Sequence, residues 1–568
     1  MLRFAAVISV LVAAFFLGTA VAGAIRWSHP VPYWDMWDGY LSFWFELQDG
    51  NNAIWWELSN EHHLVLLKAI FWLDLSLFGG SQAFLVAVNF LITAGIALAL
   101  MLLLRERLMF GVTFRFSPSV FVILSSALVV VTFSWMQGEE LVFPYHAHFL
   151  LTVFVALLAF GTLGIAAHRL RERPAVSNLC FGVAFASSLI APWTSASGLF
   201  LPFLAAALAA LIGLGRVRSW SFVVLGVLSA IVYRIDSPFL RADGDGPIAN
   251  LVASPIEVLR FWLIYLGGPW AVVTDSQLVG GAAGLVFLIV VPSLTVLAIR
   301  RGRYSRSVLV VLAYPIFMLI SSGVTAAGRV NLGIEQVTAI RYLTPMLAGW
   351  ACLLVLAAPR LQLWFTRPVP LALLGLVALP VLLLPEQVSA LTPKYGTIHA
   401  RDTAALAVSL GVPDASAIVP VYPFSIERPM ELGSRARIEG VSMFARDPYS
   451  SLQETLNEPV QGKEAATCTG WLETRVPVEN SSWDRVDGWV FVEGTPLSEG
   501  ILTLTDRMAQ TIGWVVIGKP RNDVREQNPA ANGLNGYSGY MKSGAASGDI
   551  FVAGEAFRCS QPLSPAVP

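Results

Sequence analysis

The chain has 568 residues, of which 55% are hydrophobic and only 13% are charged, and its mean hydropathy is +0.65. An ordinary soluble domain carries about 25% charged residues, so this composition excludes a soluble globular enzyme and a disordered chain. The 37 basic and 38 acidic residues leave no basic excess, so we expect no nucleic-acid partner. Many apolar runs reach the ~20 residues needed to cross a bilayer, which predicts a membrane protein.

About eleven apolar runs predict transmembrane helices. They lie at residues 4–25, 83–104, 119–136, 147–167, 178–194, 197–214, 220–235, 278–299, 307–326, 341–358 and 369–385. Every second connection is short and rich in arginine, namely 105–115, 169–173, 216–218, 300–306 and 360–367. The positive-inside rule assigns these connections to the cytoplasm, with a cytoplasmic N-terminus and an extracytoplasmic C-terminal region. This multi-pass layout favours a bacterial inner (plasma) membrane.

Three apolar segments need a separate interpretation. If residues 62–78 crossed the membrane, they would reverse the orientation of the spans that follow, so we expect them to form a helix lying in the outer interface. We interpret residues 256–271 in the same way. Residues 4–25 follow Arg3 and end in small residues, as a cleaved signal would. Their run of about 20 apolar residues favours an uncleaved anchor.

Hydrophobicity falls after Pro385, which divides the chain into a transmembrane domain (1–385) and two extracytoplasmic parts. Residues 386–465 have a mixed composition and predict a connector of helices and strands. Residues 466–568 alternate between apolar and polar positions with turn residues between the runs, which predicts an antiparallel β-sandwich. Examples are the runs 488–492, 501–504 and 514–517.

The chain has four cysteines, and two of them, Cys468 and Cys559, lie near the two ends of the β-region. An outward-facing domain permits oxidation, and the first and last strands of a sandwich are often close. We therefore expect a disulfide between them, with two free buried thiols as the alternative. Cys180 and Cys352 fall within predicted spans, where packing is the simpler role.

Four tryptophans of the β-region could bind sugars by stacking on them, or they could belong to the core. They are Trp471, Trp483, Trp489 and Trp514. The core is the better-supported alternative, because large aromatic side chains dominate the cores of such domains.

The first outer loop contains an aromatic motif with two acids, Tyr33-Trp34-Asp35-Met36-Trp37-Asp38. Acids three residues apart share a face if the segment is helical, and the aromatic residues suit a membrane interface. A carboxylate there could take a proton from a hydroxyl group or hold a divalent metal. Asp35 and Asp38 are therefore candidate catalytic residues, and capping of the next helix is the alternative, chiefly for Asp38.

A second polar motif, Asn60-Glu61-His62-His63, precedes the expected interfacial helix. Adjacent histidines do not share a helix face, so joint metal binding is awkward and hydrogen bonding to substrate is the better role for Glu61 and His62. Lys68 follows one to two turns later and could meet a phosphate. The alternative is a solvated loop.

The second acidic loop contains Glu139 and Glu140 and lies between two spans. This pair could complete a site with Asp35 by binding an acceptor or a metal, or it could simply be a short exposed loop. His146 and His148 start the following span, where a polar residue is costly unless it is used.

Two arginines, Arg329 and Arg341, are expected on the outer side, against the positive-inside bias. A guanidinium at the end of a span suits bidentate contact with a lipid-linked phosphate. Snorkelling to lipid head groups is the alternative.

Several enzyme classes lose support because their motifs are missing. The sequence has no P-loop, no glycine-rich dinucleotide fingerprint, no HExxH motif and no nucleophile elbow. Charged residues gather at the outer ends of the spans and not in mid-membrane, which argues against an ion-coupled transporter.

The layout resembles the GT-C-fold glycosyltransferases that use polyprenyl-phosphate sugars, the superfamily of lipid A aminoarabinose transferase and protein O-mannosyltransferases. Three features carry the resemblance: the motif at 33–38, the segment from Glu61-His62-His63-Leu64 to Leu77-Phe78-Gly79, and the acidic loop Glu139-Glu140. It covers about residues 1–385. The relatives usually have a lysine or histidine followed by prolines where this chain has His62-His63-Leu64.

The resemblance implies a hexosyl- or pentosyltransferase, and it implies roles for particular residues. Asp35 would be the general base or acceptor-positioning group, and Glu139 or Glu140 would bind the acceptor or a divalent Mg²⁺ or Mn²⁺ ion. Arg341 and Lys68 would hold the donor phosphate. The expected partners are a polyprenyl-phosphate sugar, membrane lipid and a cell-envelope glycan or lipid acceptor. Two other functions stay open, a lipid-linked glycan flippase or transporter and a non-catalytic scaffold for polysaccharide assembly.

Overall fold

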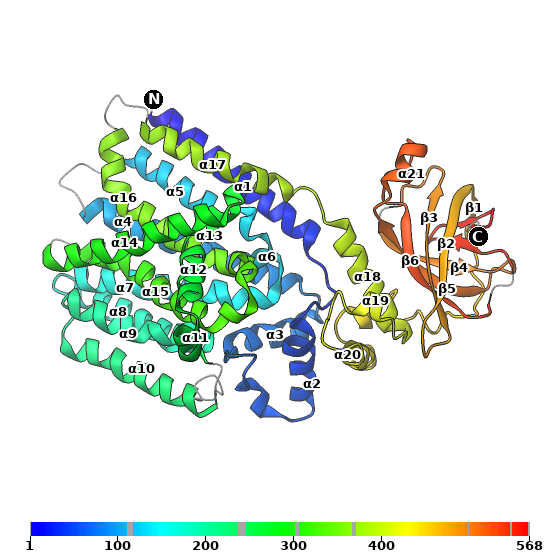
Figure 1. The fold of residues 1–568 in the computed structure, drawn as a ribbon, viewed down its shortest axis with the longest axis horizontal. Coiled ribbons are helices and arrows are strands. Elements are labelled where there is room, and N and C mark those ends of the chain that lie inside the picture. The colour runs from blue at the N-terminus through cyan, green and yellow to red at the C-terminus, as the bar shows by residue number, and fades with distance from the viewer. Residues whose placement is uncertain are drawn as a thin grey trace. The chain divides into compact units, whose positions relative to one another are not determined.

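The computed structural model describes residues 2–110, 117–236, 246–301, 306–365, 371–497, 499–545 and 548–565. Its internal contacts divide the chain into two compact units. The helical unit comprises residues 1–28, 53–70 and 85–392, and the second unit comprises residues 29–52, 71–84 and 393–568. Parts of the segment between residues 29 and 84 thus belong with the C-terminal region, and each unit is described by itself (Figure 1).

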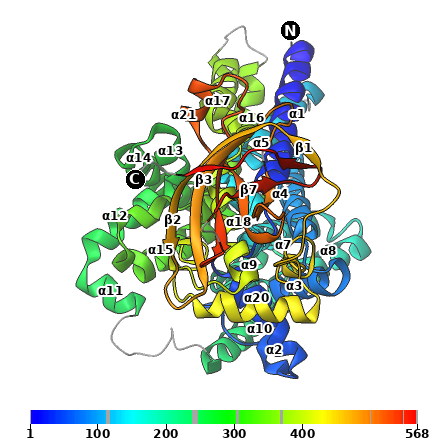
Figure 2. The ribbon, with the colours of Figure 1, turned by 90° about the vertical axis from the view of Figure 1, so that its right-hand side faces the viewer.

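Apolar helices lie side by side in the helical unit (Figures 1 and 2). They are α1 (Leu2–Trp27), α4 (Ala83–Phe110), α5 (Pro118–Thr132), α6 (Gly138–Val142), α7 (Ala147–Arg169), α8 (Pro174–Ile190), α9 (Phe200–Leu211), α10 (Arg216–Asp236), α11 (Pro247–Ala253), α12 (Pro255–Leu266), α13 (Gly268–Thr274), α14 (Gln277–Arg301), α15 (Arg306–Arg329), α16 (Leu343–Phe365) and α17 (Leu371–Ser389). Short 3-10 turns extend several of them, including η3 (Trp135–Gln137), η4 (Pro144–His146), η5 (Ala191–Trp193), η6 (Ala196–Leu199), η9 (Val330–Leu332) and η11 (Ile340–Tyr342).

Nine helical stretches of the described residues are long and apolar enough to cross a membrane, which identifies a multi-pass membrane protein. They are Leu2–Trp27, Ala83–Leu108, Pro118–Val142, Pro144–Arg169, Pro174–Trp193, Arg216–Arg234, Gln277–Arg301, Arg306–Leu332 and Ile340–Phe365. A tenth is possible if α11 and α12, which meet at a bend of 113°, form one broken span.

The expected count of eleven spans is therefore not reached among the described residues. The expected run 197–214 gives only the shorter apolar helix Ala196–Leu211. Residues 369–370 of the expected run 369–385 lie outside the described residues, and the rest of the run contains the start of the shorter apolar helix Val377–Ser389. The expected interfacial segment at 62–78 forms helix α3 (Val65–Phe78), which is not one of the candidate spans. Residues 256–271 form α12 and part of α13, and α12 counts toward a span only together with α11.

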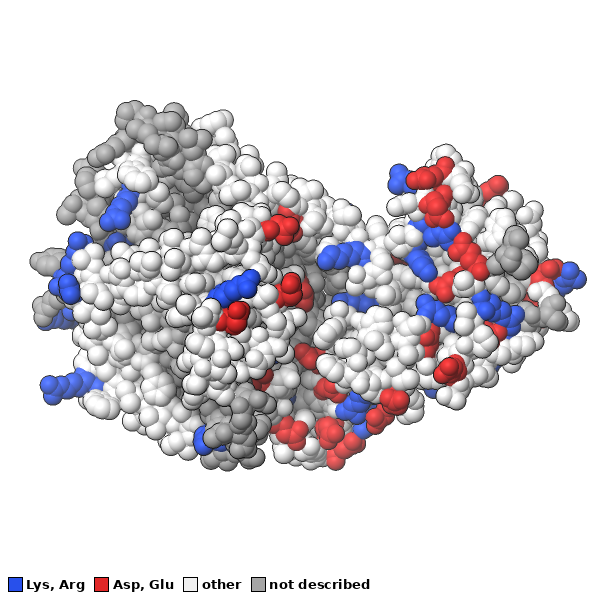
Figure 3. All heavy atoms as spheres, in the orientation of Figure 1, with Lys and Arg blue, Asp and Glu red and all other residues white. Residues whose placement is uncertain are grey.

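Arginines mark one end of these helices. Arg107, Arg169 and Arg300 stand in the last turns of α4, α7 and α14, where a cation interacts favourably with the carbonyl end of the helix dipole. The Arg107 guanidinium donates a hydrogen bond at 3.3 Å to the Oγ of Ser307, which lies at the start of α15. The end of α4 therefore lies beside the start of α15. Figure 3 shows Lys and Arg gathered at one end of the helical unit, with few charged side chains over the helices in that view.

The second unit begins with a π-helical turn η1 (Trp37–Ser42) and α2 (Phe43–Gln48), which follow α1 in the chain. Its C-terminal part starts with α18 (Tyr395–Leu410), α19 (Ala415–Ile418) and α20 (Glu427–Glu439). Gly411 and Gly440 follow α18 and α20 in the left-handed conformation, which ends each helix. The regular structure of the connector 386–465 is mostly helical, and its one strand begins at Glu464, within its last two residues.

Nine strands form one continuous sheet in the order β1-β8-β7-β4-β5-β6-β3-β2-β9. They are β1 (Glu464–Ala466), β2 (Cys468–Pro477), β3 (Trp483–Val492), β4 (Gly500–Thr505), β5 (Thr511–Lys519), β6 (Gly536–Lys542), β7 (Phe551–Ala553), β8 (Phe557–Cys559) and β9 (Ser564–Pro565), with α21 (Asn522–Gln527) between β5 and β6. The predicted strand runs coincide with β3, β4 and β5. Hydrogen bonding joins all nine described strands into a single sheet and not into the two sheets of the expected sandwich.

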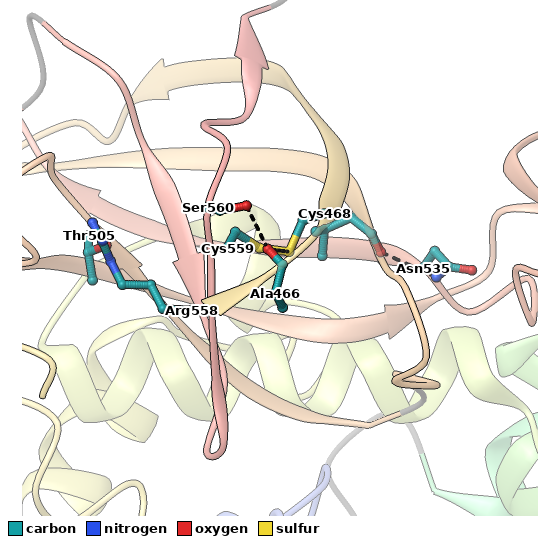
Figure 4. Close-up of a disulfide and its surroundings, with 8 residues drawn as sticks. Ala466, Cys468, Thr505, Asn535, Arg558, Cys559 and Ser560 are labelled. Carbon is teal, nitrogen blue, oxygen red and sulfur yellow. Dashed lines mark hydrogen bonds between the residues drawn. A yellow bond between two sulfur atoms is a disulfide. The ribbon is translucent and has the colours of Figure 1, made fainter. Parts of the chain in front are cut away.

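The expected disulfide between Cys468 and Cys559 is present. It joins the start of β2 to the end of β8 (Figure 4). Both cysteines belong to a core formed by buried side chains such as Val486, Val515 and Tyr537. Cys180 and Cys352 are free thiols in the helical unit.

Candidate functional site

An ion pair between Glu61 and Arg329 lies at the centre of the polar residues in the helical unit. Glu61 belongs to the loop before α3, and Arg329 is the last residue of α15. The Tyr233 hydroxyl, from α10, donates to the backbone carbonyl of Glu61 at 3.1 Å. Two helices that are distant in sequence, α10 and α15, therefore hold this loop at the end of the apolar helices.

His62 lies beside the Glu61–Arg329 pair, and its hydrogen bonding defines which ring nitrogen carries the proton. Its Nδ1 accepts the backbone N–H of Ala196 at 3.2 Å, so the neutral ring carries its proton on Nε2. That nitrogen lies 3.8 Å from Glu61 Oε1. The ring of His148, at the start of α7, is centred 5.4 Å from the ring of His62.

A row of buried hydroxyls adjoins the two histidines. The Thr152 hydroxyl lies 2.9 Å from that of Thr194 and 3.0 Å from that of Ser195, which in turn lies 2.8 Å from that of Ser197. These hydroxyls come from α7 and from the segment between α8 and α9. They form a chain of hydrogen bonds between α7 and that segment, in otherwise apolar surroundings.

Burial and charge set the ionisation of Glu61 and His62. Burial raises the pKa of Glu61, but the nearby charges of His62 and Arg329 outweigh it and the pKa is lowered overall. Burial lowers the pKa of His62, against the opposing effect of the Glu61 charge. At neutral pH the arrangement is a carboxylate, a guanidinium and a neutral imidazole.

The second acidic loop places its two glutamates differently. Glu140 is fully buried, and one of its oxygens lies 3.0 Å from His146 Nδ1. The side chain of Glu139 is 48% exposed and lies 4.0 Å from the same nitrogen. Glu139 is thus the member of the pair that can reach a bound molecule, and Glu140 lies buried beside His146. The charge of Arg341, before α16, acts on both Glu140 and His146.

Lys68 is buried in the first turn of α3. Its ammonium donates to the backbone carbonyls of Ile54 at 2.6 Å and Glu57 at 2.7 Å. Burial lowers the pKa of Lys68 to about 8. The two bonds hold the 54–57 segment against α3 and leave one of the three ammonium hydrogens for another partner.

Asp35 and Asp38 belong to the second unit. Asp38 lies inside the first turn of η1 and caps nothing with its side chain. Its carboxylate accepts the Tyr422 hydroxyl at 2.6 Å and Arg428 Nε at 3.2 Å. Burial and the Asp38 carboxylate raise the pKa of Tyr422 to about 12, and the charge of Asp35 contributes in the same direction.

The structure therefore brings together Glu61, His62 and Arg329 in one cluster and Glu139, Glu140 and Arg341 in another. His146 and His148, neighbours in sequence, link the two clusters in the helical unit. Within the described residues, no three His, Cys, Asp or Glu side chains are grouped to hold a metal ion.

Sequence reasoning missed Tyr422 and Arg428, the partners of Asp38. Arg428 lies 390 residues further along the chain, in a segment with no distinguishing motif. It also missed Tyr233 and the buried hydroxyls, which look like ordinary residues of apolar helices. His146 and His148 carried a usable signal, because polar residues are rare in a span unless they have a role.

The tryptophans of the sheet divide into two kinds. Trp483 and Trp514 are buried, and Trp471 is 36% exposed. Trp471 pairs across β2 and β3 with Trp489, and the two rings are stacked with centroids 6.0 Å apart.

No protein-family model, no curated protein and no solved structure matches this chain.

Proposed function

We propose that the protein is a membrane glycosyltransferase that moves a sugar from a polyprenyl-phosphate donor to a cell-envelope glycan or lipid acceptor. The observation that carries the proposal is the convergence of Glu61, His62 and Arg329 with the Glu139–Glu140 loop and Arg341 at one end of apolar helices. Transfer from a lipid phosphate needs cations for the departing phosphate and a carboxylate for the incoming hydroxyl. Both kinds of group are concentrated where a lipid-linked substrate would present its head group.

The reaction breaks the bond between the sugar C1 and the phosphate oxygen and forms a bond between C1 and the acceptor oxygen. The polyprenyl phosphate leaves, and the acceptor proton passes to a carboxylate. Arg329 and Arg341 stabilise the phosphate charge as that bond breaks, since guanidinium groups bind phosphate in a bidentate manner. The donor is already activated, so no nucleotide is needed.

The residue that takes the acceptor proton is chosen by the pKa and the hydrogen-bond partners of each candidate. A general base works best with a pKa near the working pH, and the lowered pKa of Glu61 makes it a better partner for Arg329 than a base. His62 is also unsuited, because its Nδ1 already accepts a hydrogen bond. The proposed base remains Asp35, on the strength of the resemblance, with Asp38 second because Arg428 and Tyr422 engage its carboxylate.

We further propose that the protein lies in a bacterial inner membrane with the polar cluster on the extracytoplasmic side. The arginines in the last turns of α4, α7 and α14 support this orientation through the positive-inside rule.

Mass spectrometry of surface glycans tests the function. The gene is deleted and the strain is complemented with wild type, Asp35→Asn or Glu431→Gln, a matched change to an exposed carboxylate of α20. We expect one sugar mass to disappear on deletion and to return with wild type and Glu431→Gln only. Loss of the whole polymer with accumulated lipid-linked precursor would indicate a flippase instead. Full restoration by Asp35→Asn would remove Asp35 as the base.

A further inference from the structure

A pocket that opens to the surface lies at the arginine-rich end of the helical unit. Helices α4, α7 and α15 form its walls, with apolar side chains such as Leu103, Leu157 and Val310. On α4 the lining runs from Ala99 to Arg107. Eight residues of α-helix rise about 12 Å, so the pocket reaches well below the arginines at its rim.

The rim of this pocket carries an excess of positive charge. Arg107 and Arg306 lie there with His168, and Glu106 is the one acidic side chain of the lining. The Arg107 guanidinium donates only to Ser307 Oγ among the described residues, at 3.3 Å, and its buried Nε has no hydrogen-bond partner there. Both arginines therefore retain donors that an anion can use.

The chemistry of the lining identifies the ligand class. A deep apolar wall below a cationic rim matches a molecule with a hydrocarbon chain and a phosphate at its end. The pocket also lies at the opposite end of the spans from the cluster around Arg329, since Arg306 begins α15 and Arg329 ends it. It is thus separate from the proposed donor site.

We propose that this pocket binds an acyl chain of an anionic phospholipid, and that Arg107 and Arg306 hold its head-group phosphate. The apolar wall removes chain methylenes from water or bulk lipid, and the two guanidinium groups select a negatively charged head group. Glu106 opposes the head-group charge but is outnumbered by the arginines.

Native mass spectrometry of the purified protein tests this proposal with phosphatidylglycerol and phosphatidylcholine of identical acyl chains. We expect wild type to retain more phosphatidylglycerol. Arg107→Gln and Arg306→Gln should each reduce that retention by roughly fivefold, since a cation near a lipid surface contributes about that factor, without changing the retention of phosphatidylcholine. Arg300→Gln is the control, because Arg300 stands in the arginine-bearing last turn of α14 but outside the pocket lining. It should change the retention of neither lipid.

A second variant tests whether the apolar wall of the pocket binds the acyl chain. A Cβ at Gly161 would meet only Leu103, at 3.6 Å, so Gly161→Leu extends into the pocket without a backbone clash. We expect it to reduce retention of both lipids, and Leu158→Trp serves the same purpose if Gly161→Leu fails to fold.

Equal retention of the two lipids by wild type, or unchanged phosphatidylglycerol retention in the double arginine variant, would overturn the proposal. Unchanged retention in a folded pocket-filling variant would overturn the acyl-chain assignment.

Discussion

The Glu61 carboxylate pairs with the Arg329 guanidinium across 268 residues of chain. Their side chains are 20% and 32% exposed, which places the pair between a surface salt bridge and a fully buried one. A partly buried pair matters most when one partner is lost, because the other charge is left poorly solvated. The pair therefore holds the loop before α3 on the end of α15 and keeps Glu61 ionised.

A double-mutant cycle measures this coupling. We expect Glu61→Gln and Arg329→Gln to lower the free energy of unfolding, with a coupling energy of about 1–2 kcal/mol, intermediate between exposed and buried pairs. Glu257 and Arg260 on α12 form a matched control, because their side chains are 56% and 55% exposed and 4.0 Å apart. Their coupling should be about 0–0.5 kcal/mol. Equal coupling in the two cycles would contradict the structural role of the Glu61–Arg329 pair.

Lys68 predicts a pH dependence of stability. Its pKa falls from 10.5 to about 8 on folding, so between these values the unfolded chain binds a proton that the folded chain does not. Stability should therefore rise from pH 8 to pH 10.5, by up to about 3 kcal/mol, and this gain should be absent below pH 8. Thermal unfolding in detergent, followed by tryptophan fluorescence, measures the profile.

Lys68→Met is the variant for this measurement. It removes the hydrogen bonds to the carbonyls of Ile54 and Glu57, which should cost about 1 kcal/mol because these partly buried acceptors each lose a charged donor. It should also abolish the rise in stability between pH 8 and 10.5. A wild-type slope that persists in Lys68→Met would assign the titration to another group.

Asp38 and Glu431 share Arg428 as a partner, which allows a direct comparison. Asp38 also accepts the Tyr422 hydroxyl, whereas Glu431 lies on the same helix as Arg428 and is 70% exposed. We expect Asp38→Asn to destabilise the protein by about 1 kcal/mol and Glu431→Gln by less than about 0.5 kcal/mol. Chemical denaturation of the purified variants checks the difference, and equal effects would show that the Tyr422 bond contributes nothing.

The Cys468–Cys559 disulfide closes a loop with a sequence separation of 91. In a Cys180→Ala/Cys352→Ala background, maleimide should label no thiol of the denatured protein until a reductant is added, and two afterwards. Cys468→Ser/Cys559→Ser should lower the stability of the sheet by about 2–4 kcal/mol, because the unfolded chain gains freedom. Two labelled thiols without reduction would contradict the bond and the extracytoplasmic placement of the sheet.

The sequence predicted the elements better than their assembly. Nine of the expected spans follow from runs of about 20 apolar residues, which leave the backbone little choice in a bilayer. Strands β3, β4 and β5 follow from two-residue alternation. The single sheet could not be predicted, because strand order depends on pairings such as β1 with β8, between residues 464–466 and 557–559, that alternation does not encode.

The same limit applies to the candidate site. Glu61 and Glu139 could be selected individually because they stand in polar motifs beside the spans, and Arg329 because it lies against the positive-inside bias. Their grouping depended on the fold. The partners of Asp38 could not be found, because Tyr422 and Arg428 lie in the connector, far along the chain, without a local motif that marks them.

The most direct test of the central claim is consumption of the lipid donor by the purified protein. A lipid extract of the deletion strain supplies the accumulated donor whichever sugar it carries, and wild-type membranes treated to remove that sugar supply the acceptor. Liquid chromatography with mass spectrometry should show a polyprenyl-phosphate species losing one sugar mass with wild type and with Glu431→Gln, but not with Asp35→Asn. A folded wild-type protein that leaves every polyprenyl-phosphate sugar unchanged would contradict the assignment as a glycosyltransferase.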